Sequence, residues 1–258
     1  MAVALAARLR GDIHAASPLV MLHGFGAGGF AFDPVAPLLG GRVTTLCPDL
    51  PGHAGSLRHE GLGGAGRIAK AVMADLEERG VGAFHLAGHS LGGAVAVLIA
   101  LRNPERVKSL TLIAPGGIGP EINHAALARY AEVRSPDDIA SALVPFFAPG
   151  ASVPAALVES MAAARKDPEA IGALQTILAA MMNAESGGVR QGVLPLSAMA
   201  ALPMPIHVLW GDGDEILPVS QSLDLPGNVT VERIAGAGHM LMDEAAERVA
   251  RVLDAQCA

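Results

Sequence analysis

Residues 84–100, FHLAGHSLGGAVAVLIA, constrain the fold more than any other part of the chain. An apolar strand is predicted to end near Ala87, a glycine-rich turn follows, and an apolar helix begins at once. A strand–turn–helix built around G-x-S-x-G is a nucleophile elbow, in which the serine sits at the tip of a strained turn. The flanking positions must be glycine because neighbouring chain passes too close for a side chain. The segment therefore predicts that Ser90 is a nucleophile and that Gly88 and Gly92 are its elbow glycines.

Short apolar runs alternate with amphipathic stretches along most of the chain. Several of the runs are almost continuous in Val, Leu and Ile, which is typical of parallel strands covered on both faces. Strands are expected at 18–23, 42–47, 83–88, 107–114, 206–210 and 229–234, with room for one further short strand at 2–9. Helices are expected at 34–40, 66–79, 91–102 and 240–254, the first with Asp33 as N-cap and Pro34 at its first position. This alternation predicts an α/β fold with a mostly parallel, doubly wound sheet.

The alternation stops between residues 119 and 200, where Ala, Leu, Met and Pro dominate. Short helices are expected there at 122–133, 136–147, 153–165 and 168–183. Insertions of this kind occur where loops leave the carboxyl ends of strands, which is the functional edge of such sheets. We therefore expect an α/β core formed by residues 1–118 and 201–258, and a helical cap insertion formed by residues 119–200.

The loop HGFGAGG at 23–29 allows two interpretations. Gly24, Gly26 and Gly29 satisfy G-x-G-x-x-G, and Asp49 follows at the distance of a ribose-binding acid in a dinucleotide site. However, the same spacing recurs in GLGGAG at 61–66, where no strand precedes it. The loop is better suited to the oxyanion hole of the predicted elbow, with Phe25 and Leu91 as the backbone N–H donors.

A serine nucleophile needs a base, and the base needs an acid that orients it. In folds with this elbow the chain order is Ser, acid, His. Past the strand at 206–210 we expect Asp214 to be the acid, with Asp212 as second choice, and His239 in the glycine-flanked loop before the last helix to be the base. We expect His23 to brace the oxyanion loop and the ring of His89 to point away from the reacting centre.

Charge and cysteine content exclude several classes of partner. The formal net charge of −7 offers no electrostatic footprint for nucleic acid. No window is apolar enough to span a membrane, the N-terminus lacks the features of a signal peptide, and Cys47 and Cys257 do not form the framework of a secreted protein. His85 and His89 are four residues apart, which would suit a metal site only on a helix, and they are expected on a strand and turn. We therefore expect no metal site there. We expect a cytoplasmic protein without metal or cofactor.

The chain resembles the α/β-hydrolase fold family in HGFG at 23–26, PDLPGHAGS at 48–56, GHSLGG at 88–93, WGDGDEILP at 210–218 and GAGHM at 236–240. Within that family, residues 110–123 and the following helices are most similar to the hydrolase-like C-terminal region of the dihydrolipoamide acetyltransferase component of acetoin dehydrogenase complexes. Only about seventeen residues precede the first predicted inner strand, so we expect no lipoyl domain and none of its swinging-arm chemistry. The resemblance implies an enzyme acting on ester bonds.

The leading functional hypothesis is a serine hydrolase that cleaves an ester or thioester of a small or aliphatic acyl group through an acyl-serine intermediate. The first alternative is acyl transfer to a thiol acceptor. The second is a non-catalytic binding module that retains the fold. The expected partner is a small-molecule ester or thioester, with no nucleic acid and no membrane, and the oligomeric state stays open, a homodimer included.

Overall fold

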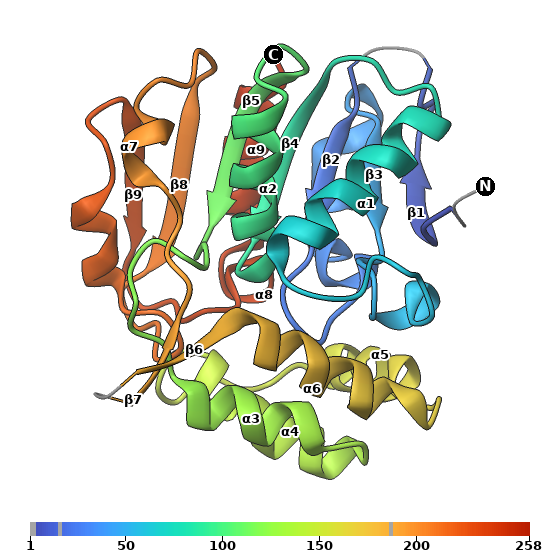
Figure 1. Ribbon diagram of the computed structural model, residues 1–258, viewed down its shortest axis with the longest axis vertical. Helices are drawn as coiled ribbons and strands as arrows, with labels where there is room; N and C mark the ends of the chain where they lie inside the picture. The colour runs from blue at the N-terminus through green and yellow to red at the C-terminus, as the bar shows by residue number, and fades with distance from the viewer. Residues whose placement is uncertain (1–3, 15–16, 186–187) are drawn as a thin grey trace.

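A seven-stranded sheet forms the centre of the computed structural model, which describes residues 4–14, 17–185 and 188–258. Its spatial order is β1-β3-β2-β4-β5-β8-β9 (Figure 1). The edge strand β1 runs antiparallel to β3, and every other neighbouring pair is parallel. The strands are β1 Ala7–Arg10, β2 Leu19–Leu22, β3 Thr45–Pro48, β4 Phe84–His89, β5 Val107–Ile113, β8 Ile206–Gly211 and β9 Val229–Ile234. The predicted α/β fold class is confirmed.

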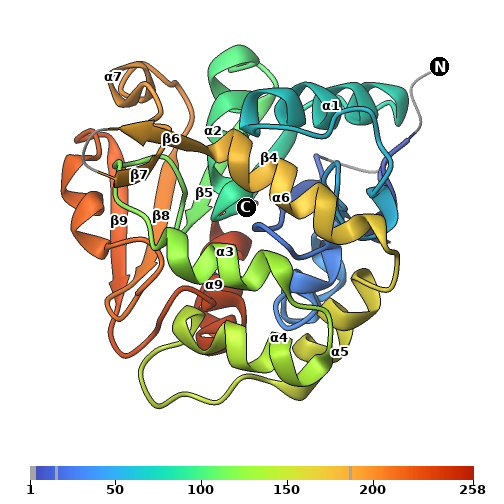
Figure 2. The ribbon, with the colours of Figure 1, turned by 60° about the horizontal axis from the view of Figure 1, so that its bottom comes forward.

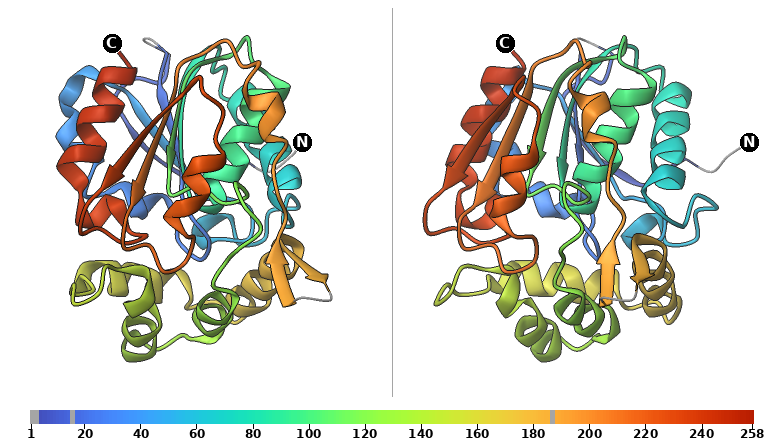
Figure 3. Two further views of the ribbon diagram at one scale, coloured as in Figure 1. Left: turned by 90° about the vertical axis from the view of Figure 1, so that its left-hand side faces the viewer. Right: turned by 60° about the vertical axis from the view of Figure 1, so that its left-hand side comes forward.

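The inner strands are buried because helices cover both faces of the sheet (Figure 3). α1 (Ala65–Glu78) and α2 (Leu91–Arg102) pack side by side on one face, and α9 (Ala246–Gln256) covers the other. α1 buries Ile68, Val72 and Leu76, which lie at helical spacing on one side. α2 is buried along most of its length because it packs against β2, β4 and β5 and against the neighbouring α1.

Two of the expected helices have a different form. In place of the predicted 34–40 helix, with Asp33 as its cap, the chain forms the 3-10 segment Ala36–Arg42, and another 3-10 segment, Gly29–Phe32, precedes it. Pro34 and Pro37 lack the N–H groups that an α-helix needs, and Gly40 has a φ of +64°. The predicted helix 240–254 is broken into α8 (Leu241–Glu244) and α9, since Ala245 leaves the helical conformation with a φ of −143° and a ψ of 36°.

Between β5 and β8 the chain forms a separate layer of helices beyond the carboxyl ends of the strands (Figures 1 and 2). The side chains of Asn123 and Ser135 cap the first two helices by accepting from the N–H groups of Ala126 and Asp138. The predicted helix 168–183 ends at Met181, and an unpredicted hairpin follows. The elements of the layer are α3 His124–Glu132, α4 Pro136–Leu143, a 3-10 turn Val144–Phe146, α5 Ala155–Ala164, α6 Glu169–Met181, β6 Met182–Glu185 and β7 Gly188–Gln191. The short helix α7 (Leu196–Met199) lies outside the layer, beside α2 (Figure 1). The division into core and cap at 118/119 and 200/201 stays a prediction.

The N-terminal strand is shorter than the expected 2–9. β1 begins at Ala7, and residues 2–3 of the expected range lie outside the described part of the chain. Cys47, buried in β3, and Cys257, after α9, are both free thiols. None of the helices within the described residues combines the length and apolar character needed to cross a membrane.

Candidate active site

The elbow is formed where β4 ends at His89 and α2 begins at Leu91. Ser90, between them, has φ +52° and ψ −116°, a strained conformation for a residue with a side chain. A Cβ on Gly88 would lie 2.2 Å from the carbonyl oxygen of Gly92, and a Cβ on Gly92 would lie 2.1 Å from that of Leu22. Both positions must be glycine because backbone atoms occupy the space of a side chain.

Backbone hydrogen bonds hold Ser90 in this conformation. Its N–H donates to the carbonyl of Ile113 on β5 at 3.0 Å. Its own carbonyl accepts from Gly93 and Gly116, each at 2.9 Å. Ser90 is thereby tied to the start of its own helix and to the loop that leads from β5 into the helical layer.

Asp214 and His239 come from the loops after the neighbouring strands β8 and β9, and their side chains are in contact. Oδ2 of Asp214 lies 2.8 Å from Nδ1 of His239 and also accepts from the indole N–H of Trp210 at 3.1 Å. Oδ1 accepts from the N–H groups of Ile216 and Leu217. This carboxylate is buried and fully hydrogen-bonded, which fixes it as an acceptor for the imidazole.

Asp212, the second-choice acid, lies elsewhere. Its Oδ1 accepts from the N–H of Gly236 at 2.8 Å, so it braces the loop that precedes His239 instead of contacting the ring. Its position two residues closer to β8 leaves Asp214 as the carboxylate that reaches His239.

Ser90 and His239 line the same small cavity, of about 20 Å³. Within the described residues the Ser90 hydroxyl makes no hydrogen bond to His239. Catalytic hydrogen bonds often form only when substrate is bound, so the shared cavity is the relevant relationship. Because Nδ1 is engaged by Asp214, Nε2 is the ring nitrogen left for a proton transfer.

The predicted oxyanion donors flank the same place. Phe25 lines the cavity, and Leu91 follows Ser90 directly. Within the part of the chain that the structure describes, neither backbone N–H donates to a protein acceptor. A Cβ on Gly24 would lie 2.7 Å from Nδ1 of His89 and 3.2 Å from Cβ of Ser90, so the loop packs directly against the elbow. The N–H groups of Phe25 and Leu91 are thus free of acceptors among the described residues, as the donors of an oxyanion hole need to be.

His23 connects the glycine-rich loop at 23–29, the predicted oxyanion loop, to the loop after β3. Its Nδ1 lies 2.8 Å from the carbonyl oxygen of Gly24, and its Nε2 accepts from the N–H of Leu50 at 2.8 Å. Burial lowers the pKa of His23 to about 4, so the ring is neutral near pH 7, with the proton on Nδ1. His23 therefore braces the loop, as expected.

The expectation for His89 is wrong. Its ring lines the cavity, lies 4.8 Å from the ring of His239, and its Nε2 lies 2.9 Å from the carbonyl oxygen of His239. Burial, with a smaller contribution from His239, holds the pKa of His89 well below its usual range. The neutral ring donates through Nε2–H and fixes the backbone of His239. The tight turn at Ser90 brings the preceding side chain toward the next loops rather than away from them.

A contact with the helical layer, not foreseen from the sequence, also positions His239. The carbonyl of Phe146 accepts from the N–H groups of His239 and Met240 at 2.8 and 3.2 Å. The Glu244 carboxylate accepts from Ala148 N–H at 2.7 Å and from Gly238 N–H at 3.0 Å. In the sequence, the only sign of this role is that Glu244 lies close to the GAGHM motif at 236–240. Nothing in the sequence indicates that Glu244 contacts Ala148.

The geometry argues against the dinucleotide interpretation of residues 23–29. Both oxygens of Asp49 are occupied, since they accept from the N–H groups of Gly29 and Gly55 at 2.7 and 3.0 Å. The glycine loop also leads into a 3-10 segment, whereas a phosphate-binding loop leads into an α-helix. Within the described residues no group of His, Cys, Asp and Glu side chains has the arrangement of a metal site.

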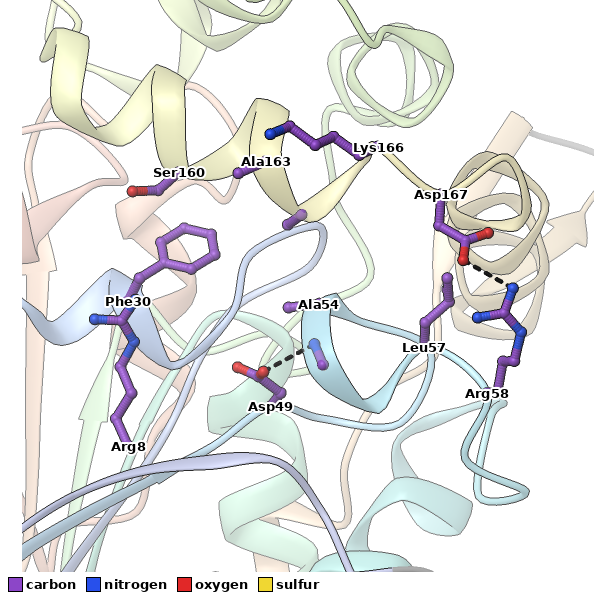
Figure 4. Close-up of a pocket in the computed structure, with 12 residues that line it drawn as sticks. Arg8, Phe30, Asp49, Ala54, Leu57, Arg58, Ser160, Ala163, Lys166 and Asp167 are labelled. Atoms are coloured by element: carbon purple, nitrogen blue, oxygen red, sulfur yellow. Dashed lines mark hydrogen bonds and ion pairs between the residues drawn. The ribbon is translucent and has the colours of Figure 1, made fainter.

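A larger cleft, of about 700 Å³, lies between α5 and the loop after β3 (Figure 4). Arg58 pairs there with Asp167 at 2.7 Å, and Asp49 accepts from Gly55. Neither Ser90 nor His239 lines this cleft. Both of these residues line the smaller cavity instead.

The chain is similar to known proteins in both sequence and fold. Residues 19–252 match the model of the "Alpha/beta hydrolase family". The chain is 34% identical over 235 residues to the dihydrolipoyllysine-residue acetyltransferase component of the acetoin cleaving system of Pseudomonas putida, covering 90% of this chain and 61% of that protein. It thus spans less than two thirds of that relative. It is 32% identical over 227 residues to the pimeloyl-[acyl-carrier protein] methyl ester esterase of Klebsiella pneumoniae, covering 81% of this chain and 78% of that one.

Among solved structures, the chain is similar to the meta-cleavage product hydrolase CumD of Pseudomonas fluorescens IP01. The TM-score is 0.81 at 19% identity, with 97% of this chain and 93% of that chain covered. At this identity the similarity establishes a common fold.

Proposed function

The chain belongs to the alpha/beta hydrolase family, and we propose that it is a serine hydrolase that cleaves a carboxylic ester or thioester through an acyl-serine intermediate at Ser90. His239 is the general base and acid, Asp214 orients it, and the N–H groups of Phe25 and Leu91 stabilise the oxyanion. The reaction needs no metal or cofactor.

Each step uses a group already described. Nε2 of His239 takes the proton of the Ser90 hydroxyl as its oxygen attacks the acyl carbon, and the carbonyl oxygen becomes an anion held by the two N–H groups. The tetrahedral intermediate collapses and expels the alcohol or thiol, which receives the proton from His239. A water molecule then attacks the acyl-serine while His239 takes its proton. The bond between the acyl carbon and Oγ of Ser90 breaks, His239 returns the proton to Oγ, and the acid is released.

The contact between Asp214 and His239, which come from the loops after β8 and β9, carries the proposal. A buried carboxylate 2.8 Å from Nδ1 favours the tautomer with its proton on Nδ1 and stabilises the imidazolium that forms during the reaction. The sequence relatives include a protein named as an ester esterase, which supports the same class of reaction.

Hydrolysis of p-nitrophenyl acetate by the wild type, Ser90→Ala and His239→Ala tests the proposal. We expect each variant to lose at least about a thousandfold in kcat while it unfolds at the same temperature as the wild type. Folded variants with wild-type rates would overturn it.

Acyl transfer to a thiol is the second candidate, because one sequence relative is named as an acetyltransferase component. The two reactions share the acyl-serine and differ in what attacks it. Product analysis with and without an added thiol such as pantetheine separates them. A dominant thioester product at millimolar thiol would favour transfer, and the free acid as main product favours hydrolysis.

A further inference from the structure

The cavity beside Ser90 is too small for a long acyl chain. Its volume of about 20 Å³ is little more than the ~10–15 Å³ that holds a single water molecule by the same kind of measure. Apolar side chains of the helical layer close it on the side away from the sheet: Leu127, Tyr130, Leu143, Phe146 and Met161. With the carbonyl oxygen directed to the oxyanion donors, this space accommodates only one or two further carbon atoms.

Tyr130 forms the least adjustable part of this wall. Its hydroxyl lies 3.1 Å from the carbonyl oxygen of Gly26 in the oxyanion loop and 2.8 Å from the sulfur of Met161. Its ring centroid lies 5.1 Å from that of Phe146 and 6.2 Å from that of Phe25. The ring is therefore held from the sheet side and from the helical layer at once.

Arg165 packs against the face of the Tyr130 ring and holds it in place. Its guanidinium carbon lies 4.1 Å from the ring centroid, and its Nη1 donates to the carbonyls of Tyr130 and Val133 at 2.7 and 2.9 Å. The side chain is 2% exposed and has no carboxylate partner within the described residues. A buried cation without a counter-ion depends on the ring face and the carbonyls beside it, which opposes any swing of Tyr130 away from the cavity.

We propose that the site accepts acyl groups of two or three carbons, and that Tyr130 and Met161 set this limit. The inference rests on the proposed function, because it takes the cavity at Ser90 to be the acyl site. It adds the size of the acyl group and the residues that determine it.

The test is a series of p-nitrophenyl esters from acetate to octanoate, in which the leaving group stays constant and only the acyl chain varies. We expect kcat/KM to be highest for acetate or propionate and to fall by at least about 100-fold by hexanoate, since each misplaced methylene costs about tenfold or more in a closed apolar pocket.

Two variants on α5 show whether the cavity wall sets the limit. Met161→Ala enlarges the cavity, and we expect it to raise the hexanoate-to-acetate ratio of kcat/KM by about tenfold or more. Leu157→Ala is the matched control, because Leu157 is buried one turn earlier on the same helix and does not line the cavity. We expect it to leave the ratio unchanged within about twofold.

The outcomes separate this inference from the function on which it rests. Hydrolysis that requires Ser90 but is fastest with hexanoate or octanoate overturns the size limit and leaves the proposed function standing. Equal shifts in Met161→Ala and Leu157→Ala overturn the assignment of the wall. Absence of Ser90-dependent hydrolysis at every chain length overturns both.

Discussion

Oδ2 of Asp214 and Nδ1 of His239 lie 2.8 Å apart, and both side chains are almost completely buried. The carboxylate is held by two backbone N–H groups and an indole, so it cannot turn away from the ring. The histidine backbone is held in turn by the carbonyl of Phe146 and by His89. The imidazole is thus positioned at both its ring and its main chain.

Asp214→Asn is expected to lower kcat for ester hydrolysis by about 10⁴-fold, because an amide would favour the wrong tautomer of His239. Asp212→Asn is the matched control, since that carboxylate contacts Gly236 and not the ring. We expect it to change kcat by less than about threefold. Steady-state kinetics on both variants decide the point, and a larger loss in Asp212→Asn would reverse the assignment.

Gly92→Ala is expected to destabilise the fold by about 3 kcal/mol or more, because the new Cβ would lie 2.1 Å from the carbonyl oxygen of Leu22. Gly172→Ala provides the contrast. Gly172 lies in α6, where a Cβ would meet no atom within 4 Å beyond the adjacent helix backbone, so alanine should be neutral or stabilise by up to about 1 kcal/mol. Urea unfolding measures both, and equal free energies of unfolding would contradict the close approach at the elbow.

Glu244 is expected to act on the reaction through the position of His239. Glu244→Ala removes the acceptors for Ala148 and Gly238, and we expect kcat to fall by about tenfold or more with little change in KM. Glu244→Gln retains one acceptor, and its kcat should lie between those of the wild type and Glu244→Ala. Glu247→Gln, on the exposed side of α9, is the control and should match the wild type. A parallel loss in all three variants would point to a general effect of charge.

Stability is expected to fall as the pH drops from about 6.5 toward 4. Burial lowers the pKa of His23 to about 4 and that of His53 to about 3, so both stay neutral in the folded protein while the unfolded chain takes up protons. Each histidine should lower the free energy of unfolding by about 2 kcal/mol between pH 7.5 and pH 5. Denaturant unfolding of the wild type and of His53→Gln tests this. The variant should show a smaller loss, and identical pH dependence would contradict the assignment to His53.

The sequence predicted the parts of the fold that local patterns determine. The strands at β2, β4, β5, β8 and β9 follow from apolar runs, and α1 follows from Ile68, Val72 and Leu76. The hairpin β6–β7 was missed because its residues carry no alternating pattern. Gln191, at its end, is held by Gly117 and Gly119, which are about seventy residues away in sequence.

The proposed site residues follow from motif order, since Ser90, Asp214 and His239 each come after a strand in the expected sequence. Contacts between loops could not be foreseen in this way. The ring of His89 is directed by the turn at Ser90, and Glu244 finds one of its partners at Ala148 in the helical layer. The first contact joins two loops of the core and the second joins the core to the helical layer, and no local pattern encodes either.

Every step of the proposed reaction depends on acylation of Ser90. Reaction of the protein with a fluorophosphonate, followed by mass measurement of the intact chain and of its peptides, tests it most directly. We expect one adduct per chain, located on Ser90, formed much more slowly in His239→Ala and absent in Ser90→Ala. Equal labelling of the wild type and Ser90→Ala, or an adduct on another residue, would contradict it.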